Sequence, residues 1–255
     1  MRILLWLMVF ASGATSLIYQ ISWVRSLSIG FGNTTYAIST VLTVFMAGLA
    51  SGYHLFGRRS DQHTSPLKVY ATLEFLLGIW AALLAWWLPA INSWTLSVAT
   101  GYPGLNAGLS FLVSVGCLLP PCTLLGGTLP VLSRTSVRHA ATRGAGLTQL
   151  YACNTLGAVA GCVSAAFLLI RQLGLTHTML LAAGTNTGLA LLAWCLSTRQ
   201  AGQPFPASAC DPQLSDTVMH ARRNPQTGPS DVGNRNGFEI SIVAFASGGL
   251  LMATE

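Results

Sequence analysis

Long apolar stretches separated by short polar stretches dominate the sequence. Six of them provide the roughly 20 apolar residues that an α-helix needs to cross about 30 Å of hydrocarbon. They lie near residues 3–24, 34–56, 69–91, 105–132, 146–170 and 174–197, and a seventh begins near residue 238. The pattern predicts an all-α integral membrane protein with six transmembrane helices and the start of a seventh.

The polar segment 198–237 divides the chain, because it contains five prolines among Ser, Asp, Asn and Gly residues. Such a composition is typical of a flexible linker. Residues 245–255 (FASGGLLMATE) repeat residues 10–20 (FASGATSLIYQ) in abbreviated form. We therefore expect a six-helix membrane domain at 1–197, a linker at 198–237, and the truncated start of a second membrane repeat at 238–255.

Composition and charge support a membrane location. Hydrophobic residues make up 52% of the chain, charged residues only 8%, and the mean hydropathy is +0.56, whereas soluble domains have about 25% charged residues. Of the 13 basic residues, all except Arg25 and Arg171 fall in one alternating set of loops. The positive-inside rule then places the N-terminus and the linker in the cytoplasm. This topology accounts for the net charge of +6, and no nucleic-acid partner is expected.

Candidate chemistry is sparse. The six cysteines form no C-x-x-C pair and no Cys/His cluster with metal-ligand spacing, so no metal or cofactor is expected. No Ser/His/Asp, H-E-x-x-H or paired-carboxylate arrangement is present either, and we assign no catalytic residue.

Small residues at a spacing of four predict where helices pack against each other, since lipid offers no hydrophobic driving force and close backbone approach supplies the contact energy. Three G-x-x-x-G pairs occur within the spans. These helix-packing residues are Gly48 and Gly52, Gly157 and Gly161, and Gly184 and Gly188.

The fourth span carries residues that disfavour a regular helix, namely Pro120, Pro121, Gly126, Gly127 and Pro130. A helix broken at membrane depth is tolerated where protein or a watery cavity satisfies the freed backbone groups. We expect this stretch to line a cavity. A simple proline kink packed against neighbouring helices is the alternative.

Polar side chains within the spans indicate where a ligand would bind. Glu74 is the only residue of the six spans with a fixed negative charge, and a carboxylate at depth is expected to face the bundle interior. The alternative is an interfacial carboxylate about one turn from Lys68 and Tyr70. The candidate substrate-binding residues, expected around one polar cavity, are Glu74, Asn154, Tyr19 and Gln20.

Three motifs carry a family resemblance: IYQISWVRSLSIGFGNTTYAISTVLTVFMAGLASG at 18–52, LPPCTLLGGTLPVL at 119–132 and LYACNTLGAVAG at 150–161. They closely resemble the membrane part of bacterial fused major-facilitator and spermidine synthase proteins. The resemblance covers about 195 residues and implies a major-facilitator-like half in the bacterial inner membrane. That family usually has Glu where this chain has Gln20, which puts a cation-binding role at this position in doubt.

The loop residues Gly57, Arg58 and Asp61 resemble the facilitator loop motif, which implies a brace between cytoplasmic helix ends. A synthase-like domain would require a Gly-rich nucleotide loop and a soluble α/β sheet, and neither pattern is present. The chain alone is therefore not expected to be an enzyme.

Two functions stay open. One is a transport-like module for a small cationic metabolite, and the other is a membrane anchor or assembly module for a spermidine synthase-like domain. Expected partners are the lipid bilayer and either such a domain or a second membrane half encoded downstream.

Overall fold

The computed structural model describes residues 2–31, 34–59, 65–101, 106–136 and 143–200. Within these ranges every element is helical: α1 (Arg2–Phe31), α2 (Thr34–Arg59), α3 (Pro66–Gly101), α4 (Asn106–Ser136), α5 (Arg143–Ser164), the π-helix η3 (Ala165–Leu169) and α6 (Ile170–Gln200). The linker beyond residue 200, the segment 238–255 and Asp61 lie outside the described residues.

Five helical stretches are long and apolar enough to cross a membrane: Ile3–Gly30, Thr34–Phe56, Pro66–Ser97, Gly108–Ser133 and Gly146–Arg199. The expected all-helical character is thus confirmed for the described residues, together with several helices long and apolar enough to span a membrane. The count differs from the expected six or seven, because α5, η3 and α6 follow one another without a loop and form a single stretch of 54 residues.

This long stretch bends at Gly174, whose backbone has φ 77° and ψ 176°. Such angles lie outside the helical region and are readily adopted only by glycine. Gly174 is also the only residue with positive φ in the described ranges. A single glycine therefore marks the point where the helix direction changes.

Several helices extend beyond the predicted spans. α1 continues to Phe31 and α3 to Gly101, whereas the predicted spans end near residues 24 and 91. Trp94 accordingly lies on a helix, with half of its surface exposed. Hydropathy locates the apolar centre of a span, whereas the hydrogen-bonded helix continues into more polar residues at its ends.

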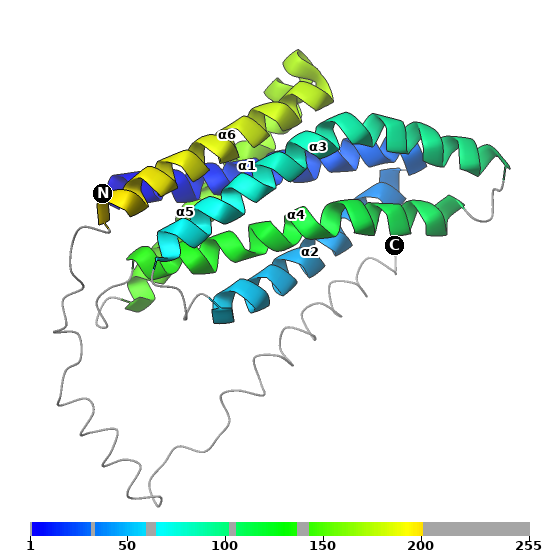
Figure 1. The fold of residues 1–255 in the computed structure, drawn as a ribbon. Helices are drawn as coiled ribbons and strands as arrows, with labels where there is room; N and C mark the ends of the chain where they lie inside the picture. Colours follow the sequence, from blue (N-terminus) through cyan, green and yellow to red (C-terminus); the bar gives the residue numbers. More distant parts are fainter. Residues whose placement is uncertain (1, 32–33, 60–64, 102–105, 137–142, 201–255) are drawn as a thin grey trace, which may run out of the picture. The chain divides into compact units, whose positions relative to one another are not determined.

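Helix α1 occupies the centre of the bundle and contacts all the other helices. The most extensive contacts join α2 to α4, α3 to α6, and α1 to α5. In Figure 1, α2 lies beside α4 and α6 runs along α3, while α5 is partly hidden behind the other helices. Two groups of buried apolar side chains fill the bundle, one centred on Tyr19, Trp23 and Leu77 and the other on Met8, Tyr70 and Leu132.

The distribution of side chains is inverted relative to a soluble protein. Large apolar residues such as Trp86, Leu112 and Phe167 are more than two-thirds exposed, while Glu74 and Asn186 are fully buried. An apolar exterior around a partly polar interior suits a surface that faces lipid tails.

Candidate functional site

A row of buried polar side chains follows one face of α1. Its members are Ser12, Thr15, Tyr19, Ser22 and Ser26, each at most 5% exposed, and their spacing of three or four residues places them on the same side of the helix. Thr15 and Ser22 donate hydrogen bonds to carbonyl oxygens of their own helix, at 3.0 and 2.8 Å. Ser12 and Ser26 instead contact α3, so this polar row is where the two helices meet.

Glu74 is the central feature of that contact. Its side chain is fully buried, and Ser12 Oγ donates a hydrogen bond of 2.7 Å to Glu74 Oε1. The second oxygen, Oε2, makes no hydrogen bond in the described part of the chain. Glu74 is also the only acidic residue within the described ranges. The structure thus places this carboxyl group in the interior of the helix bundle.

Aromatic residues surround the carboxyl group. Tyr70 precedes Glu74 by one helical turn, and both Tyr70 and Tyr19 lie within electrostatic range of Glu74. Both tyrosine side chains are completely buried. The Tyr70 hydroxyl lies close enough to interact with the Glu74 carboxyl group, although neither tyrosine hydroxyl makes a well-formed hydrogen bond within the described residues. Tyr19 also stacks on Trp23, with ring centroids 5.5 Å apart and an angle of 11° between the planes. Two tyrosine hydroxyl groups without a well-formed hydrogen bond therefore lie near this buried acid.

Asn154 and Gln20 are placed differently from Glu74. Both are half-buried, and Asn154 packs against Gly13 where α5 meets α1; a Cβ atom at Gly13 would lie 2.9 Å from Asn154 Oδ1. Glu74 on α3 and Asn154 on α5 therefore both contact α1, at the adjacent residues Ser12 and Gly13. A single cavity shared by these residues remains a prediction.

Asn186 adds a second buried polar group without partners. Its side chain on α6 is fully buried, and neither the amide oxygen nor the amide nitrogen makes a hydrogen bond within the described ranges. Unsatisfied buried amides cost about 1–3 kcal/mol. Such groups are retained where a ligand, water or a second conformation satisfies them.

The expected break in the fourth span is not present. α4 runs from Asn106 to Ser136 with Pro120, Pro121 and Pro130 inside it. Pro121 lacks an N–H group and leaves the carbonyl of Cys117 without its usual partner. Trp80 of α3 supplies one, because its Nε1 donates a hydrogen bond of 3.0 Å to Cys117 O. A neighbouring helix thus satisfies the freed carbonyl, which corresponds to the alternative of a packed proline helix.

Gly126 and Gly127 belong to a packing seam and were expected to line a cavity. A Cβ atom on Gly126 would overlap the backbone of Leu49, and one on Gly127 would lie against the ring of Phe56. From the other side, a Cβ atom on Gly52 would overlap Thr123 O.

Gly48 completes the same seam. A Cβ atom at this position would collide with Cys122. The glycines of α2 and α4 therefore bring these two helices into backbone contact.

The other glycine pairs separate into two classes. A Cβ atom on Gly157 would overlap Phe10 O and one on Gly161 would overlap Ala14 O, so this pair packs directly on α1. Gly184 and Gly188 differ from expectation, since a Cβ atom on either would meet nothing within 4 Å in the described structure. Both are exposed because α6 turns the opposite face toward α3, where a Cβ atom on Gly78 would lie 3.0 Å from Ala183 O.

A second polar junction joins α1 and α3 at their other ends. Asn92 Nδ2 donates hydrogen bonds to Ser26 O and Ser26 Oγ at 2.7 and 3.1 Å. Hydropathy ended the predicted span at residue 91 and left Asn92 in a loop. Gly30 of α1 leaves room for this amide, but the pairing joins two different helices, and no local signal in the sequence indicates it.

Of the loop motif, Gly57 and Arg58 lie in the last turn of α2. Comparisons of the chain with family models, curated proteins and solved structures gave no match.

Proposed function

We propose that the chain is a membrane-embedded helical module of transport type that binds a small cation at Glu74. The observation that carries this proposal is the state of the Glu74 carboxyl group, which is fully buried, has one oxygen without a partner and lies beside α1. Only proteins that use such a group are expected to tolerate it, because intramembrane ionisable residues are costly to bury.

The site needs a positive charge. The described structure pairs Glu74 with the neutral hydroxyl of Ser12 and with no basic side chain. An isolated ionised carboxylate in an apolar interior is strongly disfavoured, so either a proton or another cation must accompany it. Since Glu74 has no exposed surface, any cation larger than a proton can enter only when α1 and α3 separate. Uptake is thereby coupled to helix movement.

Six membrane crossings are the natural interpretation of the helices. The stretch Gly146–Arg199 has 54 residues and would extend about 80 Å as one straight helix, against roughly 30 Å of hydrocarbon. The bend at Gly174 divides it into two parts of about 28 and 25 residues, each long enough to cross once. We therefore count α5 with η3 as one crossing and α6 as the next.

The pattern of helix contacts supports a transporter-like half. Suppose that α1–α3 and α4–α6 are two equivalent repeats, so that α1 corresponds to α4, α2 to α5 and α3 to α6. The contact of α1 with α5 then corresponds to the contact of α4 with α2, and the contact of α3 with α6 corresponds to itself. These are the three most extensive contacts. Two three-helix repeats of opposite orientation, as in each half of a major-facilitator transporter, produce this relation.

The glycine seams follow the same exchange. The second helix of each proposed repeat carries a G-x-x-x-G pair, and that pair packs on the first helix of the other repeat: Gly48 and Gly52 on α4, and Gly157 and Gly161 on α1. Along each seam, residues of increasing number on one helix contact residues of increasing number on the other. The two helices of each pair therefore run parallel. A shared packing rule at two equivalent places supports internal repetition.

The resemblance to fused major-facilitator and spermidine synthase proteins indicates that this cation is a small metabolite. A carboxylate with two tyrosine side chains nearby suits an ammonium group. By the same resemblance and the distribution of basic residues, we place the chain in the bacterial inner membrane with a cytoplasmic N-terminus. An anchor for a spermidine synthase-like domain is the competing function, and it requires no ligand at Glu74.

Ligand-dependent stability of the purified full chain in detergent separates these functions. We expect spermidine, used as the probe, to raise the melting temperature of the wild type and to have no effect on Glu74→Gln. Ser12→Ala should weaken the response, because Ser12 holds one carboxylate oxygen. Ser51→Ala is the matched control, since Ser51 is exposed and bonds only to its own helix.

Equal shifts in the wild type and Glu74→Gln would assign the effect to binding elsewhere and refute the role of Glu74. If neither spermidine nor smaller amines shift the melting temperature of the wild type, the transport proposal fails and the anchor function is favoured.

A further inference from the structure

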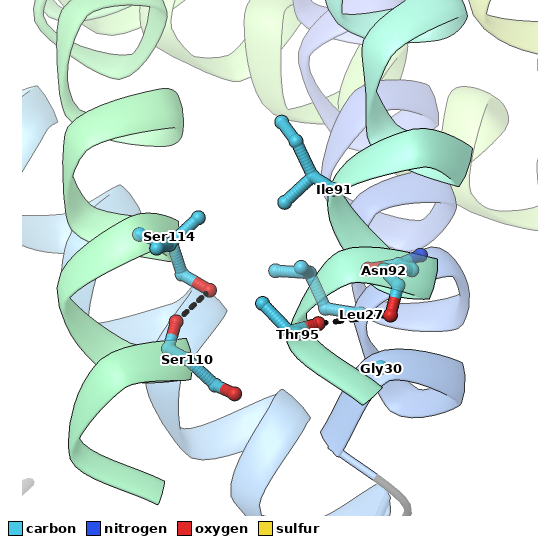
Figure 2. Close-up of a pocket in the computed structure, with 8 residues that line it drawn as sticks. Leu27, Gly30, Ile91, Asn92, Thr95, Ser110 and Ser114 are labelled. Carbon is cyan, nitrogen blue, oxygen red and sulfur yellow. Dashed lines mark hydrogen bonds between the residues drawn. The ribbon is translucent and has the colours of Figure 1, made fainter. Parts of the chain in front are cut away.

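A small cavity lies between α3 and α4, close to the second polar junction. It has a volume of about 10 Å³ and is lined by residues of α1, α3 and α4 (Figure 2): Leu27, Gly30, Ile91, Asn92, Thr95, Ser110, Val113 and Ser114. A cavity of roughly 10–15 Å³ is the smallest that accommodates one water molecule. Its size therefore restricts a ligand to a single water or an ion of similar radius.

Asn92 brings an unsatisfied acceptor to this cavity. The side chain is 7% exposed, and its Nδ2 must face Ser26, because the Ser26 carbonyl oxygen can only accept a hydrogen bond. This fixes the orientation of the amide. Asn92 Oδ1 is consequently turned away from Ser26 and makes no hydrogen bond within the described residues.

Two hydroxyl groups at the cavity can accept a further hydrogen bond. Thr95 Oγ1 donates to Asn92 O at 3.0 Å, and Ser114 Oγ donates to Ser110 O at 2.7 Å. Figure 2 shows both bonds, with the α3 residues on one side of the cavity and the serines of α4 on the other. Since each hydroxyl has used its proton, its lone pairs are the groups that face an incoming donor.

Gly30 keeps the amide oxygen accessible. A Cβ atom at this position would lie 2.7 Å from Asn92 Oδ1 and 3.3 Å from Thr95 Oγ1. A side chain on α1 would therefore occupy the space beside the acceptor.

We propose that this cavity binds one water molecule, which donates one hydrogen bond to Asn92 Oδ1 and the other to the Ser114 hydroxyl, and so links α4 to the α1–α3 pair. A water has two protons to donate, and Asn92 Oδ1 and the Ser114 hydroxyl, which already donates to Ser110 O, can each accept one. A sodium ion would fit by size, but none of the lining side chains is charged, and an uncompensated cation is disfavoured there. The inference does not depend on the function proposed for Glu74.

A double-mutant cycle on the full chain in detergent tests the link. Asn92 and Ser114 share no direct hydrogen bond in the structure, so independent side chains would give additive effects. We expect the unfolding equilibrium constants of Asn92→Ala, Ser114→Ala and the double variant to deviate from additivity by at least about threefold. Ser133→Ala is the matched control on α4, because Ser133 also bonds only to its own helix; combined with Asn92→Ala, it should be additive within about twofold. If the effects of Asn92→Ala and Ser114→Ala on the unfolding equilibrium are additive, the proposal is refuted.

Two further measurements keep the proposal testable if Asn92→Ala fails to fold. An experimental structure of the unmodified chain that resolves waters should show density at about 2.5–3.0 Å from Asn92 Oδ1, and a cavity without density would refute the site. Replacing sodium by choline should leave the melting temperature of the wild type unchanged. A sodium-dependent rise that is lost in Ser114→Ala would assign the site to a cation and overturn the water.

Discussion

Gly161→Ala should destabilise the helix bundle by forcing α1 and α5 apart. A Cβ atom on Gly161 would lie 2.7 Å from both Ala14 Cα and Ala14 C, whereas carbon atoms in contact are about 3.5–4.0 Å apart. The obstacle is backbone, which cannot rotate away as a flexible side chain would. The two helices must therefore separate by about 1 Å.

The cost follows from the weaker van der Waals attraction across the widened seam. A gap of 0.5–1 Å removes roughly a quarter to a half of the attraction between two atoms, which is about 0.1–0.2 kcal/mol at the optimal distance. Over some 40–60 atom pairs, roughly the number that one buried leucine makes, the seam is weakened by about 2–3 kcal/mol. This agrees with the penalty of about 1–3 kcal/mol that is typical of overpacked cores.

Gly184→Ala is the matched control, because a Cβ atom there meets nothing within 4 Å. Both substitutions gain up to about 1 kcal/mol of helix propensity, so their difference isolates the steric effect. The free energy of unfolding, measured by circular dichroism during titration of mixed micelles with a denaturing detergent, should be about 2–3 kcal/mol lower for Gly161→Ala than for Gly184→Ala. Values that agree within about 0.5 kcal/mol would refute the backbone contact between α1 and α5.

The packing and the topology support three further predictions. Gly52→Ala should lower the free energy of unfolding by about as much as Gly161→Ala, since its Cβ atom would overlap Thr123 O at the equivalent seam; an unchanged unfolding curve would contradict the proposed repeat. Trp80→Phe should cost about 1–2 kcal/mol in the same assay, because the Cys117 carbonyl loses its donor, and a neutral effect would mean that another group satisfies this carbonyl. Reporters fused at the N-terminus and at Gly202 should report the same side of the membrane if the helices cross six times; opposite sides would mean an odd number of crossings.

The sequence predicted the elements whose signal is local. Apolar stretches located the helices, and the cost of burying a charge correctly directed Glu74 to the interior. The G-x-x-x-G spacing anticipated close contacts at Gly157 and Gly161, where the structure places α1. Gly184 and Gly188 have the same spacing but make no such contact in the described structure. The spacing shows that one face of a helix carries small residues, but not whether a neighbouring helix packs on that face.

Features that depend on a distant partner could not be predicted. The prolines of α4 suggested a broken helix, and only the position of Trp80, 37 residues earlier in the sequence, shows how the freed carbonyl of Cys117 is satisfied. Asn92 looked like a loop residue until its bonds to Ser26, 66 residues away, placed it inside the bundle. In both cases the deciding hydrogen bond joins different helices, whereas hydropathy and residue spacing describe one helix at a time.

The central position of α1 constrains the order in which the protein can be assembled. α1 is synthesised before α3 and α5, yet Ser12 bonds to a residue 62 positions later and the Trp6 carbonyl accepts from Cys153, 147 positions later. At about 5–20 residues per second, synthesis of the chain that completes these contacts takes roughly 7–30 s. The α3 partners of Ser12 and Ser26 are synthesised within about 3–13 s, whereas the α5 partner of the Trp6 carbonyl follows only at the end of this interval. α1 therefore reaches its full set of neighbours only after α5 and α6 have been synthesised.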